Sequence, residues 1–185
     1  MRRLVALGIS ANVLTLGGFF LNATAGLVAA LGALPLAGLL YLLSSSLDFL
    51  DGAVARLSGA AGPFGAFFDS VLDRASEASV LVGLVYWYAV QQQPSLAAVS
   101  GGALTGSFLV SYARARAEGL GYDCEVGWLQ RTERVIVLGT GLLLSGLHPL
   151  VVPCVLVLLA LATAATTLQR IRHVAQLTRA GQTRC

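Results

Sequence analysis

The stretch that decides both the fold and the site runs from residue 48 to residue 74 and reads DFLDGAVARLSGAAGPFGAFFDSVLDR. Asp48 and Asp51 end one long apolar run at i, i+3 spacing, and Asp69 and Asp73 open the next at i, i+4 spacing. These spacings place each pair of carboxylates on one face of a helix. The short glycine-rich connection predicts two antiparallel helices lying side by side, with all four carboxylates converging on one pocket.

The composition around this stretch indicates an integral membrane protein. Of the 185 residues, 56% are apolar and only 11% are charged, with a mean hydropathy of +0.78, whereas an average soluble domain is about 25% charged. A water-soluble domain of this size could not bury so much apolar surface. We expect a single domain over residues 1–185, with a tail that is loosely held from about residue 174.

Apolar runs of about 20 residues, the length that crosses a bilayer, occur six times. The expected spans are 12–32, 34–56, 66–90, 95–117, 132–148 and 150–170. All 12 basic residues are Arg, and with six spans every Arg falls on one side of the membrane. The positive-inside rule places that side, and both chain termini, in the cytoplasm. We therefore expect an all-α protein of the plasma membrane with six transmembrane helices and a short juxtamembrane N-terminal segment. The net charge of +3 follows from this asymmetry, and no nucleic-acid partner is expected.

Four carboxylates near a membrane need positive charge among them, because an Asp at membrane depth costs about 2.5–3.5 kcal/mol. Oxygen ligands in this number suit Mg²⁺ or Mn²⁺, and we expect two ions about 3.5–4 Å apart. Gly52 and Gly65 beside the acids let backbone or substrate come close. Arg56, one turn beyond Asp51, can hold a phosphate. The alternative is a buried network with Arg56 and Arg74, but two Arg do not neutralise four Asp.

The stretch resembles the signature of the CDP-alcohol phosphotransferase family, D-x2-D-G-x2-A-R-x8-G-x3-D-x3-D. Every interval is matched, at Asp48, Asp51, Gly52, Ala55, Arg56, Gly65, Asp69 and Asp73. Members are small six-helix membrane enzymes that transfer a phosphatidyl or similar group from a CDP-linked donor to an alcohol and release CMP. The resemblance covers nearly the whole chain, and it implies CDP-diacylglycerol as a substrate and, because the family tends to dimerise, a homodimer.

The resemblance also implies a role for each residue of the signature. Asp48, Asp51 and Asp69 would hold the metal ions, and Asp73 would complete the metal site and act as general base on the acceptor hydroxyl. The CDP-lipid would be bound by Asn12, Thr15, Asp48, Asp51, Gly52, Arg56 and Gly62.

Two of these donor assignments depart from the core signature. Gly62 stands where relatives often carry Ser or Thr, so a contact there would come from the backbone. Asn12 and Thr15 fit an N-x-x-T pattern that many members place at the start of the first span, and the alternative is that Asn12 only caps a helix.

A second cluster of arginines surrounds the connection between the fourth and fifth spans, in SYARARAEGLGYDCEVGWLQRTERV, residues 111–135. A basic pocket opposite a metal-bound pyrophosphate favours a second anion, so we expect a phosphorylated acceptor. The alternative is that these arginines bind anionic membrane lipids. SYARARAE and QRTER resemble the branch of the family that makes phosphatidylinositol phosphate in actinobacteria and its archaeal counterparts. By that resemblance Arg114, Arg134 and Arg172 would hold the phosphate of inositol 1-phosphate.

Three other functions are compatible with parts of this pattern. Glycerol 3-phosphate, giving phosphatidylglycerol phosphate, would suit the same basic pocket. A divalent-cation transporter would need acids at mid-membrane, whereas all nine acids fall in the cytoplasmic half, and His148 is the one ionisable residue of the outer half. An inactive scaffold that binds CDP-lipid is disfavoured because all four Asp of the signature are present.

Overall fold

The computed structural model describes residues 11–58 and 62–181, and the side chains of residues 12–46 and 62–181. Within these ranges the chain forms helices and connecting loops and contains no strand. The helices are α2 (Ala11–Ala30), α3 (Leu34–Ser58), α4 (Pro63–Val90), α5 (Pro94–Gly119), α6 (Arg131–Leu143), the 3-10 turn η1 (Leu144–Gly146) and α7 (Val151–Arg179). The predicted all-α class is confirmed for the described residues, and each expected span overlaps one of the α-helices.

Two predicted boundaries differ from the structure. The fifth span was expected over 132–148, but α6 ends at Leu143 and η1 follows it. The tail expected to be loosely held from about residue 174 is helical as far as Arg179. No Gly or Pro falls between Pro153 and Gly181, so nothing in that segment interrupts an α-helix once it has started.

Among the residues that the structure describes, three helices are long and apolar enough to cross a membrane: α2 over Asn12–Ala30, α5 and α7. The apolar part of α3 is shorter, over Leu34–Ser46. The charged residues of the candidate site interrupt the apolar runs of α4, and α6 has only 13 residues. The structure therefore supports a multi-pass membrane protein, and six crossings with both termini in the cytoplasm stay a prediction.

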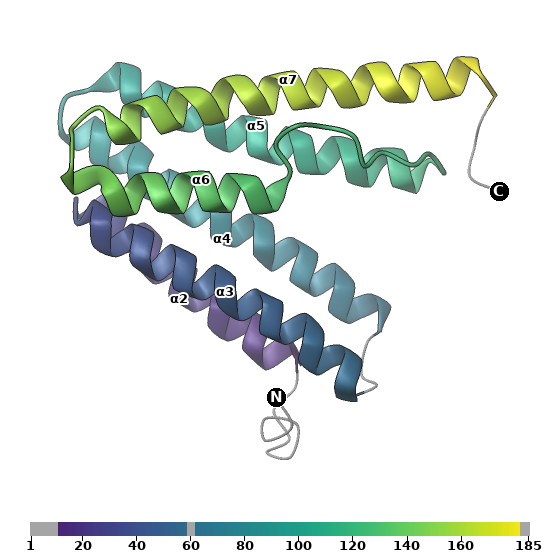
Figure 1. The fold of residues 1–185 in the computed structure, drawn as a ribbon, viewed down its shortest axis with the longest axis horizontal. Helices are drawn as coiled ribbons and strands as arrows, with labels where there is room; N and C mark the ends of the chain where they lie inside the picture. Colours follow the sequence, from purple (N-terminus) through teal and green to yellow (C-terminus); the bar gives the residue numbers. More distant parts are fainter. Residues whose placement is uncertain (1–10, 59–61, 182–185) are drawn as a thin grey trace.

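The helices are arranged in two layers of three (Figure 1). In one layer α6 packs between α3 and α7, and in the other α4 packs between α2 and α5. The layers are joined at their edges, where α2 packs on α3 and α5 packs on α7. The middle helices, α4 and α6, therefore face each other across the interior. Apolar side chains such as Leu84 and Leu142 are fully buried in the core at one end of this interior, and the charged ends of α4 and α6 line the other.

The neighbours of α3 and α4 differ from the sequence prediction, which had these two helices side by side. In the part of the chain that the structure describes, α3 packs on α2 and α6, while α4 packs on α2 and α5. Two glycines explain the tight contact between α2 and α4. A Cβ on Gly83 would overlap the carbonyl oxygen of Gly26, and a Cβ on Gly26 would overlap that of Ser79. Because α2 lies against both helices, α3 and α4 line opposite sides of an opening.

Candidate active site

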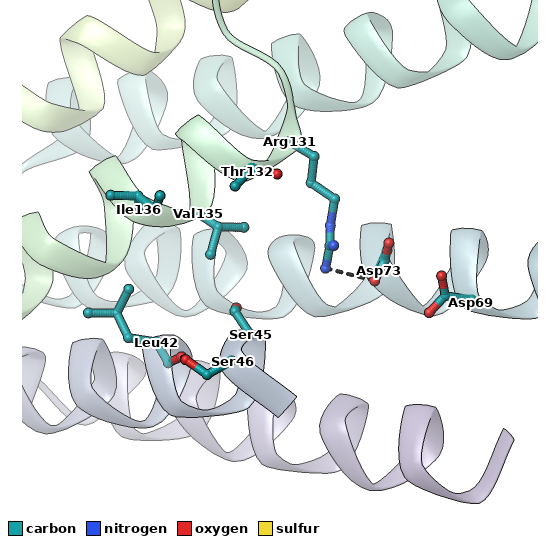
Figure 2. Close-up of a pocket in the computed structure, with 9 residues that line it drawn as sticks. All are labelled: Leu42, Ser45, Ser46, Asp69, Asp73, Arg131, Thr132, Val135 and Ile136. Atoms are coloured by element: carbon teal, nitrogen blue, oxygen red, sulfur yellow. Dashed lines mark hydrogen bonds and ion pairs between the residues drawn. The ribbon is translucent and has the colours of Figure 1, made fainter. Parts of the chain in front are cut away.

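A cavity of about 240 Å³ lies between α3, α4 and α6 at the charged end of the interior. Figure 2 shows Asp69 and Asp73 on α4, Ser45 and Ser46 on α3, and Arg131 on α6. The rest of the lining is Leu42, Thr132, Val135 and Ile136. The prediction that Asp69 and Asp73 share one helix face is confirmed, because both carboxylates line this cavity. We call it the carboxylate cavity.

The other half of the predicted carboxylate cluster lies outside the residues whose side chains are described. Asp48, Asp51, Gly52 and Arg56 belong to the last part of α3, which follows directly after Ser46. Among the described side chains no group of three or more His, Cys, Asp or Glu is close enough to hold a metal ion. The convergence of four carboxylates therefore stays a prediction.

The described groups of the carboxylate cavity nevertheless fit a hard divalent cation. Asp69 and Asp73 supply carboxylate oxygens from one helix, and Ser45 and Ser46 supply hydroxyl oxygens from another. Oxygen ligands of this kind are those that Mg²⁺ takes in proteins, and they also suit Mn²⁺.

Asp73 is paired with an arginine from the opposite layer. Nη2 of Arg131 lies 2.7 Å from Oδ1 of Asp73, an ion pair that Figure 2 marks with a dashed line. Nη1 of Arg74, the next residue along α4, lies 3.9 Å from Oδ2. The Asp73 side chain is 14% exposed, so without these cations its carboxylate would be largely removed from water and uncompensated.

A second cavity, of about 230 Å³, adjoins the first. Arg131 and Thr132 line both cavities, so the two meet at the start of α6. The second cavity collects guanidinium groups from four helices: Arg74 of α4, Arg114 of α5, Arg131 and Arg134 of α6, and Arg170 of α7. We call it the arginine cavity. Five guanidinium groups around so small a volume are a chemical environment suited to an anion.

Two of the three arginines predicted to hold the acceptor phosphate line the arginine cavity, and the third lines a different cavity. Arg114 and Arg134 both line the arginine cavity, as expected. Arg172 does not: it is exposed and lines a different cavity, while Arg170 lies in the arginine cavity. Residues two apart on an α-helix differ by about 200° around its axis, so Arg170 and Arg172 point to nearly opposite sides of α7.

Two of the arginines are held rigidly from outside the cavity. Arg134 is only 2% exposed and forms a bidentate pair with Glu77 of α4, with Nε–Oε1 at 2.7 Å and Nη2–Oε2 at 2.9 Å. Arg170 donates from Nε to the carbonyl oxygen of Val126 at 2.9 Å and from Nη1 to that of Val110. Fork-like guanidinium pairing of this kind fixes orientation as well as contributing energy.

Arg114 is the most exposed of the paired arginines in this cavity. Its Nε donates to Glu118 at 2.8 Å and its Nη2 donates to Glu125 at 2.7 Å. Glu118 is one turn along α5, and Glu125 belongs to the loop between α5 and α6. Arg114 therefore connects that loop to the rim of the arginine cavity.

Several residues of the site were not assigned from the sequence. Glu77 was the most accessible to prediction, because Asp69, Asp73 and Glu77 follow one another at i, i+4 spacing on a single face of α4. Arg131 and Thr132 show no such spacing to another site residue. The cavity that they line depends on how α6 is placed against α4. Arg170 could not be separated from Arg172 without knowing which face of α7 is buried.

The predicted donor-binding residues outside α3 lie near the starts of α2 and α4. Oδ1 of Asn12 lies 3.7 Å from the position that a Cβ on Gly65 would take, so α2 and α4 begin close together. Thr15 is buried, and Gly62 is an exposed residue at the start of α4. Neither described cavity is lined by these three residues.

Comparison with known proteins gives one consistent family. The model of the CDP-alcohol phosphatidyltransferase family matches residues 8–169. The archaetidylinositol phosphate synthase of Methanothermobacter thermautotrophicus is 36% identical over 171 residues, which cover 92% of this chain and 85% of that protein. The phosphatidylinositol phosphate synthase of Corynebacterium glutamicum is 33% identical over 172 residues, covering 91% and 78%.

Solved structures agree with the sequence comparisons. The phosphatidylinositol phosphate synthase of Mycobacterium tuberculosis with CDP-DAG bound matches with a TM-score of 0.89 and 31% identity, covering 94% of this chain and 90% of that chain. The same synthase in complex with manganese and citrate also matches with a TM-score of 0.89.

Proposed function

Because the chain belongs to the CDP-alcohol phosphatidyltransferase family and is an enzyme of that class, we propose that it transfers the phosphatidyl group of CDP-diacylglycerol to inositol 1-phosphate, also named the 3-phosphate, and releases CMP. The observation that carries this proposal is the arginine cavity, which adjoins the carboxylate cavity at Arg131 and Thr132. A phosphorylated alcohol bound there would have its phosphate among the arginines and a hydroxyl near Asp73.

The charges of the arginine cavity favour an acceptor that carries its own phosphate. Arg134 is neutralised by Glu77, and Arg114 by Glu118 and Glu125. The two contacts found for Arg170 in the described residues are both to backbone carbonyls, which leave its positive charge uncompensated. A guanidinium matches a phosphate in a two-pronged geometry, whereas a neutral polyol offers no charge to balance it.

We propose that Asp48, Asp51, Asp69 and Asp73 together hold Mg²⁺ or Mn²⁺, as two ions. The oxygen groups of the carboxylate cavity and the manganese in a relative's structure support this assignment. When bound, divalent cations neutralise the pyrophosphate of the donor and the departing CMP. The donor would also contact Asn12, Thr15, Gly52, Arg56 and Gly62, as the family signature implies.

Of these four aspartates, Asp73 is the one that can act as general base on the acceptor hydroxyl. It lines the carboxylate cavity and is paired with Arg131, which lines both cavities. In the proposed step Asp73 accepts the proton of the acceptor hydroxyl. The hydroxyl oxygen forms a bond to the phosphorus of the phosphatidyl group, and the bond from that phosphorus to the CMP oxygen breaks.

We further propose that the enzyme is a homodimer in the plasma membrane, with the active site facing the cytoplasm. The orientation rests on the arginines, all of which fall on one side if six helices cross. The dimer rests on the tendency of the family.

The experiment that tests the function is an acceptor comparison. Purified protein with Mg²⁺ and CDP-diacylglycerol is offered inositol 1-phosphate, free inositol, glycerol 3-phosphate or serine, and released CMP is measured. We expect release with inositol 1-phosphate, and none in the Asp73→Asn variant, because an amide cannot take the proton. Release with glycerol 3-phosphate alone would replace the proposed acceptor. Equal release with free inositol or serine would show that the arginines do not select a phosphorylated acceptor.

A further inference from the structure

A third cavity, of about 370 Å³, lies at the C-terminal end of α7 and shares no lining residue with the carboxylate or arginine cavity. One wall is the loop that joins α5 to α6, and the other is the last part of α7. Its lining residues are Val126, Gly127, Trp128, Gln169, Arg172, His173 and Gln176. We call it the tryptophan cavity.

The loop that forms one wall is fixed against α7 by several contacts. The carbonyl oxygen of Val126 accepts a hydrogen bond from Nε of Arg170, and the backbone N–H of Leu129 donates to Oγ1 of Thr166 at 3.3 Å. Gly127 has a φ of +132°, and a Cβ there would overlap the side chain of Thr166. Only glycine combines this backbone conformation with this approach, so the wall exists before any ligand binds.

The tryptophan cavity carries positive charge without an acidic partner. Across the described residues, no hydrogen bond or ion pair engages the side chain of Arg172 or His173. Glu125, the acid nearest in sequence to Val126, is already paired with Arg114 at 2.7 Å. An arginine that lines the same cavity as an apolar ring and has no counter-charge favours an anion from outside the protein.

The depth of the cavity in the membrane follows from the length of α7. An α-helix rises 1.5 Å per residue, so a hydrocarbon core of about 30 Å takes about 20 residues. Counted from Val151 at the start of α7, this distance ends next to Arg172. Leu168 and Ile171, the last large apolar side chains that α7 exposes, are 55% and 57% exposed. When α7 crosses the bilayer from Val151, this length places Arg172 and His173 at the level of the lipid headgroups.

Trp128 strengthens this placement. Its side chain is 78% exposed although it belongs to a loop that is fastened to α7. Tryptophan is enriched at the interface between membrane and water, where its ring contacts the acyl boundary and its N–H contacts polar groups. An exposed indole beside an uncompensated guanidinium therefore matches both parts of a phospholipid, its apolar edge and its phosphate.

We propose that the tryptophan cavity binds the phosphate headgroup of one anionic phospholipid of the membrane, distinct from the substrates of the active site. Arg172 donates to the phosphodiester oxygens, His173 donates a ring N–H, and Trp128 covers the glycerol region. A zwitterionic lipid would place its own cation near Arg172 and be bound less well. The proposal requires only that the protein is embedded in a membrane, so it stands or falls independently of the proposed reaction.

The test measures lipid binding to the full-length protein in detergent, without substrates. Native mass spectrometry follows the bound fraction as phosphatidylglycerol or phosphatidylcholine is titrated. Arg172→Gln should weaken phosphatidylglycerol binding about tenfold, the effect of one charge-assisted contact. Arg179→Gln is the matched control: it removes the same charge from the same helix about two turns further on, and should change binding by less than about twofold. Trp128→Leu provides a second variant that keeps the charge, and it should also weaken binding.

Three results would overturn the proposal. Equal losses in Arg172→Gln and Arg179→Gln would mean that net surface charge, not the cavity, attracts the lipid. Equal binding of phosphatidylcholine and phosphatidylglycerol would remove the requirement for an anion. Displacement of phosphatidylglycerol by an equal concentration of inorganic phosphate would make this a site for free phosphate instead of lipid.

Discussion

Arg131 occupies the point at which the carboxylate cavity and the arginine cavity meet. Its guanidinium is 2.7 Å from the Asp73 carboxylate, and the same residue lines the arginine cavity. A divalent cation bound to Asp73 would share that carboxylate with the guanidinium of Arg131. The two positive groups would repel each other. A divalent cation held by Asp73 would weaken the Arg131–Asp73 pair, and the Arg131 guanidinium would then be available to the phosphate of the acceptor.

This inference predicts that Arg131→Gln tightens metal binding. Two unit charges of like sign about 4 Å apart repel by about 4 kcal/mol at an effective dielectric constant of 20, before salt screening. Because about 1.4 kcal/mol is a factor of ten in a dissociation constant, and salt screening and movement of the side chain remove much of this repulsion, we expect the dissociation constant for Mn²⁺ to fall at least about tenfold. The electron paramagnetic resonance signal of free Mn²⁺, titrated without substrates, measures it directly.

Arg114→Gln is the control for this experiment, because Arg114 lines the arginine cavity but is paired with Glu118 and Glu125. Its Mn²⁺ affinity should match that of the natural protein. Weaker Mn²⁺ binding in Arg131→Gln would show that Arg131 supports the metal site instead of competing with it.

Arg170 and Arg172 allow a test of which arginine binds the acceptor phosphate, because they are two positions apart and line different cavities. Loss of one charge-assisted contact costs about 1.5–3 kcal/mol, so Arg170→Gln should raise the KM for inositol 1-phosphate about tenfold or more. Arg172→Gln should change that KM by less than about twofold. Initial rates of CMP release, with the donor saturating, give both values.

Arg170→Lys accompanies this pair, since it keeps the charge of a residue that is 3% exposed and bound to two carbonyls. Its KM should lie between those of the natural protein and Arg170→Gln. An effect of Arg172→Gln as large as that of Arg170→Gln would restore the assignment made from sequence resemblance.

At the scale of the helices, the contact between α2 and α4 keeps α3 and α4 on opposite sides of the opening. The contact is backbone to backbone at Gly26 and Gly83. Gly83→Ala would place a methyl group against the Gly26 carbonyl, and overpacking of this kind costs about 1–3 kcal/mol. We expect a lower midpoint of thermal unfolding in mild detergent, followed by circular dichroism.

Gly101→Ala on α5 is the matched substitution, because a Cβ there meets no atom within 4 Å. It should leave the midpoint unchanged or raise it, since Ala is favoured over Gly in a helix by about 0.5–1 kcal/mol. Equal effects of the two substitutions would show that the α2–α4 contact is not close-packed.

The whole molecule has a polar end, where the cavities lie, and an apolar end. Its predicted topology places His148 outside the cell and the C-terminus inside. In a Cys154→Ser chain, a membrane-impermeant maleimide should label Cys185 only after the membrane is permeabilised. The thiol introduced by His148→Cys, with Cys154 and Cys185 changed to Ser, should be labelled in intact spheroplasts.

Cys124 can be left in place during this labelling. It is fully buried in the loop between α5 and α6, and burial raises the pKa of its thiol, so it stays protonated and unreactive at neutral pH. Labelling of both reporters from the same side would contradict the predicted topology.

The sequence alone determined the helix positions, the membrane class, the family and the carboxylate face of α4. Each of these depends on properties carried by residues close together in the chain. Apolar runs set the helices, and i, i+4 spacing put Asp69 and Asp73 on one face. Glu77 lay within reach of the same rule, one turn further along α4.

Only the tertiary structure decided which helices face each other and which arginines share a cavity. The neighbours of α3 depend on the close approach of α2 and α4. Two glycines permit this approach, but nothing in the sequence indicates that these two glycines meet. The choice between Arg170 and Arg172 depends on which side of α7 packs against α5 and the loop after it. The buried face of a lipid-embedded helix cannot be identified from its amphipathicity, because both its buried and its exposed faces are apolar. Packing in three dimensions is the information that resolves it.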